Sequence, residues 1–141
     1  MFYYYLKTWS YGAICDENWE KQNIKYCPEC GRSFFQKYDS IEFRDGAFDA
    51  SVVMGSLSIG DFFVRYLRDD FLDLLPELKD ISTFGTLVNA KTKELLPNWT
   101  LVYAPQITLR GSQASSFRAC RVCRRIFYMR SEPYSILEQD I

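Results

Sequence analysis

The sequence predicts an α+β fold, in which a small and mostly antiparallel sheet carries one main helix. Three observations support this prediction. Aromatic residues make up 17% of the 141-residue chain, one segment has helical apolar spacing, and two Cys-x-x-Cys motifs stand far apart. Aromatic side chains favour strands, and a chain of this length is typical of one domain with its own core. We therefore expect a single domain over residues 1–141.

Short segments with strand composition alternate with turn residues along the chain. The first is the aromatic stretch at 2–9, which Ser10-Tyr11-Gly12 closes. The polar stretch from Asp16 to Lys25 predicts a surface loop or a short helical turn. Further strands are expected around 41–43, 83–88 (where Gly85 suggests a bulge), 99–103 (before Pro105) and 107–109, with a polar turn at 89–93.

The main helix is expected from Asp61 to Leu75. Ser58 and Asp61 stand in the positions of a capping box, and Pro76 stops the helix from continuing. The apolar residues recur at helical spacing: Phe63, Val64, Leu67, Phe71, Leu74 and Leu75.

Two cysteine motifs, Cys27-Pro-Glu-Cys30 and Cys120-Arg-Val-Cys123, predict a metal site. Four thiolates in two such pairs are what a tetrahedral zinc ion needs. The gap between the motifs, residues 31–119, is 89 residues, whereas a simple zinc ribbon leaves roughly 15–20. We expect a structural Zn²⁺ in a split ribbon, with halves at 24–36 and 117–129 around an α+β insert at 37–116.

The same cysteines allow two other interpretations. The pairs could be unmetallated or redox-active, or they could be two half-sites that a partner chain completes. A redox motif normally opens a helix, whereas Cys30 is followed by the turn sequence Gly31-Arg-Ser33. The fifth cysteine, Cys15, is most simply a small buried apolar residue.

Charge is unevenly distributed although the net charge is only −1, which gives no general attraction to phosphate. The second motif is rich in arginine and could bind nucleic acid, offset the charge of a zinc–thiolate centre or pair with the acidic helix. The aspartates of the expected helix are most simply its solvated face, or a contact surface for a basic partner. These candidate partner-binding residues are Asp69, Asp70, Asp73, Arg118, Arg121, Arg124 and Arg125.

Catalysis is not expected. The chain has no histidine, which is the commonest general base, and four Cys ligands leave a zinc ion no position for water. It also lacks the common nucleophile and phosphate-binding motifs. The start of the chain does not have the features of a signal peptide and no apolar run is long enough to span a membrane, so we expect a cytoplasmic protein.

The cysteine pattern resembles that of the double-CxxCG immunity proteins, which protect bacteria against their own contact-delivered toxins. The resemblance lies in Cys27-Pro-Glu-Cys30-Gly31 after a short strand-rich start, a long insert and a late second motif, where Arg124 replaces the family's glycine. It also includes a middle segment like 61–78. It implies that the four cysteines bind metal and that the protein neutralises a toxin by binding it. A zinc-ribbon protein that binds nucleic acid through the arginine-rich motif is the alternative.

Overall fold

The computed structural model describes residues 12–34, 36–49, 51–105, 117–123 and 126–128, and for 117–119 and 126–128 the backbone alone. The chain forms two compact units. The barrel unit comprises Met1–Ile24 and Phe35–Pro105, and the cysteine unit comprises Lys25–Phe34 and Gln106–Ile141. The strands predicted at 2–9 and 107–109 lie outside the described residues.

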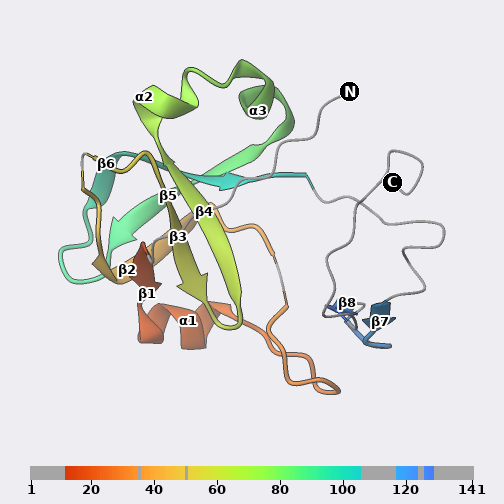
Figure 1. Ribbon diagram of the computed structural model, residues 1–141. Coiled ribbons are helices and arrows are strands. Elements are labelled where there is room, and N and C mark those ends of the chain that lie inside the picture. The colour runs from red at the N-terminus through yellow and green to blue at the C-terminus, as the bar shows by residue number, and fades with distance from the viewer. Residues whose placement is uncertain (1–11, 35, 50, 106–116, 124–125, 129–141) are drawn as a thin grey trace. The chain divides into compact units, whose positions relative to one another are not determined.

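The barrel unit is a closed barrel of six strands, so the predicted α+β fold with one main helix is wrong. Its strand order is β1-β2-β5-β6-β4-β3, and β1 closes it by pairing antiparallel to β2 and parallel to β3 (Figure 1). β2 and β5 are also parallel, and the remaining neighbours are antiparallel. The strands are β1 Ala13–Cys15, β2 Ser40–Gly46, β3 Met54–Ile59, β4 Phe62–Arg68, β5 Thr83–Asn89 and β6 Leu95–Tyr103.

The segment predicted as the main helix forms strand β4 instead. Phe62, Val64 and Tyr66 are buried while Phe63 between them is 54% exposed, which is the two-residue period of a strand. Val64 belongs both to the helically spaced residues and to this alternation. The aromatic and β-branched residues of segment 62–68 favour the strand. Helix begins only at Asp69, in the short α2 Asp69–Leu72, and resumes in α3 Pro76–Ile81. At Pro76 the proline stands in the first turn of a helix, where its missing N–H costs nothing.

The expected capping box is a β-hairpin turn. Ile59 pairs with Phe62, so Gly60 and Asp61 form the two-residue loop that joins β3 to β4. Gly60 has a φ of +53°, a conformation that glycine adopts at little cost and that two-residue hairpin loops need. Glycine therefore marks a chain reversal here, not the start of a helix.

Aromatic rings fill the barrel. Tyr66 is fully buried, and its ring lies 5.2 Å from that of Phe48 and 5.4 Å from that of Trp99. The Tyr66–Trp99 contact is edge-on, and such aromatic pairs stabilise a core beyond the effect of burial alone. A Cβ atom at Gly12 or Gly55 would collide with the Tyr66 side chain, so both positions have room only for glycine. The buried cluster also includes Ile41, Leu57, Ile59, Leu87 and Leu101.

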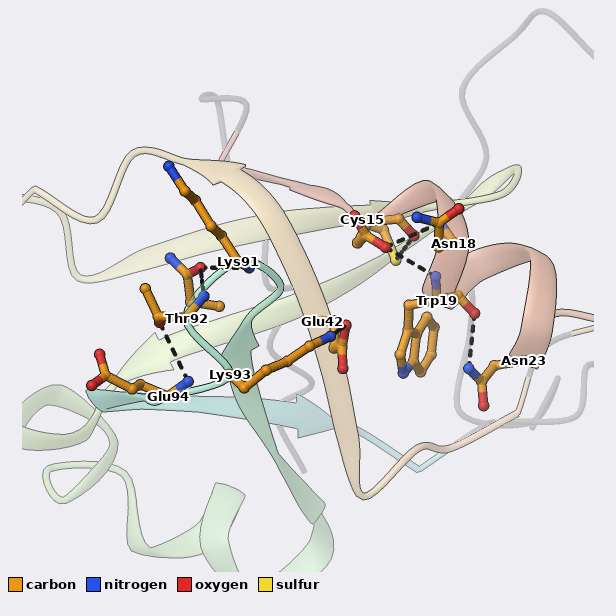
Figure 2. Close-up of polar contacts among 11 residues, drawn as sticks. Cys15, Asn18, Trp19, Asn23, Glu42, Lys91, Thr92, Lys93 and Glu94 are labelled. Atoms are coloured by element: carbon orange, nitrogen blue, oxygen red, sulfur yellow. Dashed lines mark hydrogen bonds and ion pairs between the residues drawn. The ribbon is translucent and has the colours of Figure 1, made fainter.

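The other sequence-predicted elements of this unit are present. The polar stretch after β1 forms helix α1 Glu17–Asn23, which Asp16 caps by accepting hydrogen bonds from the N–H groups of Asn18 and Trp19 at 3.0 Å. The turn at 89–93 joins β5 to β6, and Lys93 there pairs with Glu42 of β2 at 2.6 Å (Figure 2). The bulge predicted at Gly85 lies instead between Thr86 and Val88, and Gly85 itself pairs in register with Leu101. A Cβ at Gly85 would meet the carbonyl oxygen of Tyr38 at 2.6 Å, so close backbone approach explains this glycine. Among the described helices, none is both long and apolar enough to cross a membrane.

Candidate metal centre

Each cysteine pair stands on a tight turn of the cysteine unit. In the first turn, Tyr26 and Ser33 form an antiparallel bridge. The N–H of Cys27 donates to the carbonyl of Arg32 at 2.7 Å, and the N–H of Gly31 donates to the carbonyl of Cys27 at 2.9 Å. Gly31 has a φ of +69°, so the residue that follows the motif has the backbone conformation that favours glycine.

The second turn, around Arg121 and Val122, lies between two short antiparallel strands. These are β7 Phe117–Ala119 and β8 Ile126–Tyr128, with Ala119 opposite Ile126. Cys120 follows β7 directly, and Cys123 ends the turn. Both Cys-x-x-Cys motifs are thus loops between paired segments, as a chelating turn requires.

The four sulfur atoms form one cluster. All of them lie within 4.8 Å of one another, and no other group of this kind occurs in the part of the chain that the structure describes. The Sγ atoms of Cys27 and Cys120 are 3.7 Å apart, as are those of Cys30 and Cys123. Zn–S bonds of about 2.3 Å in a tetrahedron place the sulfurs about 3.8 Å apart. The described cysteines are free thiols, so the cluster has the spacing and chemical form that a tetrahedral metal needs.

Backbone N–H groups act on these sulfurs. The N–H of Cys30 lowers the pKa of the Cys27 thiol to about 7. The N–H of Glu29 adds to this effect, and burial opposes it. At Cys120 the N–H of Cys123 also acts to lower the pKa. Burial and the contacts with the Glu29 carboxylate and the Cys123 sulfur outweigh it and raise that pKa to about 12. Any metal that binds here must therefore displace a proton from Cys120, and binding weakens as the pH falls.

Glu29 is a feature of the site that the sequence did not single out. Its Oε2 atom accepts hydrogen bonds from the Cys120 thiol at 3.2 Å and from the N–H of Val122 at 3.2 Å. One carboxylate of the first turn therefore contacts both a sulfur and an amide of the second. The only signal in the sequence is the position of Glu29 inside the first motif, which by itself indicates no contact.

Cys15 lies apart from the cluster, as a buried residue of the barrel core. Burial and then the Glu20 and Asp16 carboxylates raise its pKa to about 12, so this thiol stays protonated at neutral pH. This matches its interpretation as a small apolar residue.

The predicted partner-binding aspartates lie in and after α2, and each has a local polar contact. Asp69 accepts a hydrogen bond from the hydroxyl of Thr100 at 2.6 Å, Asp70 pairs with Arg68 at 2.6 Å, and Asp73 pairs with Lys79 at 2.8 Å. The hydrogen bond from Arg68 lowers the pKa of Asp70. Asp70 and Asp73 are exposed and have a cation beside them, and Asp69 is half-buried.

The predicted arginines belong to the cysteine unit. Arg121 is exposed within the second turn, and Arg118 stands on β7 opposite Phe127. Arg124 and Arg125 lie outside the described residues. Lys25 and Arg32, which the sequence did not single out, are exposed in the first half of this unit.

Comparison of the chain with family models, with curated proteins and with solved structures gave no match. The resemblance to the double-CxxCG immunity proteins therefore stays a prediction.

Proposed function

We propose that this chain binds one zinc ion through Cys27, Cys30, Cys120 and Cys123, and that the ion is structural. The observation that carries the proposal is the 3.7 Å spacing between sulfurs from opposite turns. A tetrahedral four-sulfur site suits zinc or iron. Zinc is the ion of closed structural sites in which four cysteines occupy every position. With no position open for water, the ion would hold the two turns together and would not catalyse a reaction.

Metal analysis of the purified chain tests this proposal. We expect one zinc per chain, and Co²⁺ exchanged into the site should give the intense visible absorption of tetrahedral cobalt–thiolate coordination. Cys27→Ser should lose the metal, while the matched variant Cys15→Ser should keep it because Cys15 lies in the barrel core. Iron in place of zinc, or equal metal content in both variants, would contradict the proposal.

We further propose that the protein acts by binding another protein, as a cytoplasmic immunity protein that neutralises a toxin. The resemblance suggests this role, and an exposed apolar surface on the barrel supports it. Ile14 pairs with Ser58, which pairs with Phe63, so the three side chains form a row across β1, β3 and β4. Ile14 is 46% exposed and Phe63 is 54% exposed. Ile14 and Phe63 thus lie on either side of Ser58 on one face of the barrel, and exposed apolar side chains gathered on one face are candidates for a contact surface.

Growth rescue tests the second proposal. Cells that express a candidate contact-delivered toxin should grow when the chain is co-expressed. Phe63→Asp should abolish the rescue without changing the zinc content, because Phe63 lies outside the cysteine unit. Thr83→Asp places a charge at another exposed strand position of the barrel unit and should leave rescue intact. Rescue that both variants retain would exclude this surface.

A further inference from the structure

We infer that Cys30 and Cys123 are an oxidation site, which closes to a reversible disulfide and releases the metal. The inference rests on the proposed zinc centre. It assigns a reaction to two of the ligands of a centre that is otherwise purely structural. Its basis is that the cluster is not uniform: sulfurs face one another across the two turns, and the two facing pairs differ in exposure.

The facing pairs join equivalent positions of the two motifs. The first cysteine of each motif faces the first of the other, Cys27 to Cys120, and the second faces the second, Cys30 to Cys123, both at 3.7 Å. A disulfide bond is about 2.05 Å long, so each pair must close by about 1.7 Å.

Exposure selects which pair reacts. Cys27 is 2% exposed and Cys120 is 7% exposed, and the carboxylate of Glu29 also lies against the Cys120 sulfur at 3.2 Å. Cys30 and Cys123 are both partly exposed. An oxidant in solution must touch a sulfur to react, and susceptibility follows exposure and thiolate character. Metal ligands are deprotonated, so in the zinc-loaded chain all four sulfurs are thiolates and exposure distinguishes them. Oxidation therefore begins at the partly exposed pair, Cys30 and Cys123.

The proposed oxidant is a hydroperoxide, for which hydrogen peroxide is the simplest probe. The thiolate of one residue attacks a peroxide oxygen, the O–O bond breaks, and a sulfenic acid and hydroxide result. The second thiolate then attacks that sulfur, the S–S bond forms and a second hydroxide leaves. Overall, two thiolates, one H₂O₂ and two protons give one disulfide and two waters. A bound zinc ion would then keep only Cys27 and Cys120 as ligands, too few to hold it.

Disulfide mapping after limited oxidation tests this site directly. The zinc-loaded full chain is treated with substoichiometric hydrogen peroxide, its remaining thiols are alkylated, and the released zinc is measured with a chromogenic chelator. Trypsin cleaves after Arg121, and a glutamate-specific protease cleaves after Glu29. These two cleavages place the four cluster cysteines on four different peptides. Cys15, buried in the barrel, is the internal reference thiol that should stay reduced.

We expect a single Cys30–Cys123 disulfide, zinc release in proportion to it, and full recovery of zinc binding after dithiothreitol treatment. Disulfides within a turn (Cys27–Cys30 or Cys120–Cys123), a Cys27–Cys120 bond formed first, or no disulfide while zinc is bound would each overturn the inference and leave the zinc proposal intact. A chain that takes up no zinc but forms the Cys30–Cys123 bond would overturn the zinc proposal and the metal release that depends on it, and would support the oxidation site alone.

Discussion

The barrel unit and the cysteine unit differ in what can hold each of them together. The barrel unit has a core cluster of 15 buried residues, most of them apolar or aromatic. In the cysteine unit, the buried residues among those whose burial is described are Cys27, Ser33 and Cys120. Burial of apolar surface is the main force that offsets the entropy of folding. For the described residues, the comparison teaches that the second unit needs another source of stability, and two of the three buried residues described there, Cys27 and Cys120, are proposed metal ligands.

Removal of the metal should produce the largest difference in stability between the two units. Structural zinc contributes on the order of 10 kcal/mol of apparent binding energy in small domains. Chelation of the metal, or Cys27→Ser, should therefore abolish order in the cysteine unit while the barrel stays folded. Hydrogen exchange measures this: the amides of Cys27, Gly31 and Phe34, which donate to backbone carbonyls, should lose protection.

The barrel amides provide the control for that experiment. Thr86 and Ala90 donate to the carbonyls of Asp39 and Phe43 within the barrel unit and should keep their protection without metal. Loss of protection in both units together would show that the chain unfolds as one cooperative body, and the comparison would then fail.

Truncation of a core side chain tests the other half of the comparison. Leu101 of β6 is fully buried in the barrel, and Leu→Ala changes at such positions cost roughly 2–5 kcal/mol. Leu101→Ala should lower the free energy of unfolding by that amount in urea titrations followed by circular dichroism. Zinc affinity, measured by competition with a chelator, should stay unchanged. Leu95→Ala, a truncation at a side chain that is 63% exposed, is the matched control and should have little effect.

The two units should respond to opposite ends of the pH scale. Burial raises the pKa of Cys15, Tyr66 and Tyr103 to about 12, whereas in an unfolded chain these groups titrate near 8.5 and 10. As the pH rises, the unfolded state loses these protons first, so the barrel loses stability between about pH 8.5 and pH 12. The cysteine unit should instead lose its metal in acid, because protons compete for the thiolates.

Thermal unfolding of the zinc-loaded chain between pH 7 and pH 11 measures the alkaline effect. The Cys15 contribution alone is roughly 3 kcal/mol by about pH 10.5. Cys15→Ala should flatten the first part of the decline. A stability that stays constant up to pH 11 would mean that the three groups ionise normally in the folded barrel.

The metal cluster could be predicted from the sequence because the pattern of its ligands is local. Two residues between cysteines force both sulfurs of a turn toward one point, and only the meeting of the two turns depends on tertiary structure. The structure brings together all four predicted ligands, Cys27, Cys30, Cys120 and Cys123. The contact from Glu29 to Val122 spans positions that are 93 residues apart. No spacing rule predicts such a contact.

The fold was predicted less well because two periodicities overlapped. Residues 62–68 satisfy a strand pattern through Phe62, Val64 and Tyr66, and a helical pattern can be drawn through Val64 and Leu67. The choice depends on the neighbour strands β3 and β6, which pair with β4 and supply its hydrogen bonds. Closure of the barrel depends on the parallel pairing of β1 with β3. Such pairing joins distant segments and leaves little local signal.

Removal of the hydroxyl group from either of two buried tyrosines of the barrel should change the free energy of unfolding least. The Tyr103 hydroxyl accepts from the N–H of Tyr38 at 3.2 Å and donates to its carbonyl at 3.1 Å. The Tyr66 hydroxyl is buried without a hydrogen-bond partner among the described residues. Tyr103→Phe should therefore lose about 1–2 kcal/mol of unfolding free energy in urea titrations, because it leaves two buried backbone groups unpaired.

Tyr66→Phe is the matched change. It should raise the free energy of unfolding or leave it unchanged. Removing a buried hydroxyl that has no partner also removes its desolvation cost, so stability should stay constant or rise by about 1 kcal/mol. The two variants delete the same atom from two buried side chains, and their difference reports on the hydrogen bonds of Tyr103. An equal loss in both variants would mean that Tyr66 donates to a bound water or to a residue outside the described part of the chain. The barrel would then depend on a buried polar contact as well as on the apolar packing that distinguishes it from the cysteine unit.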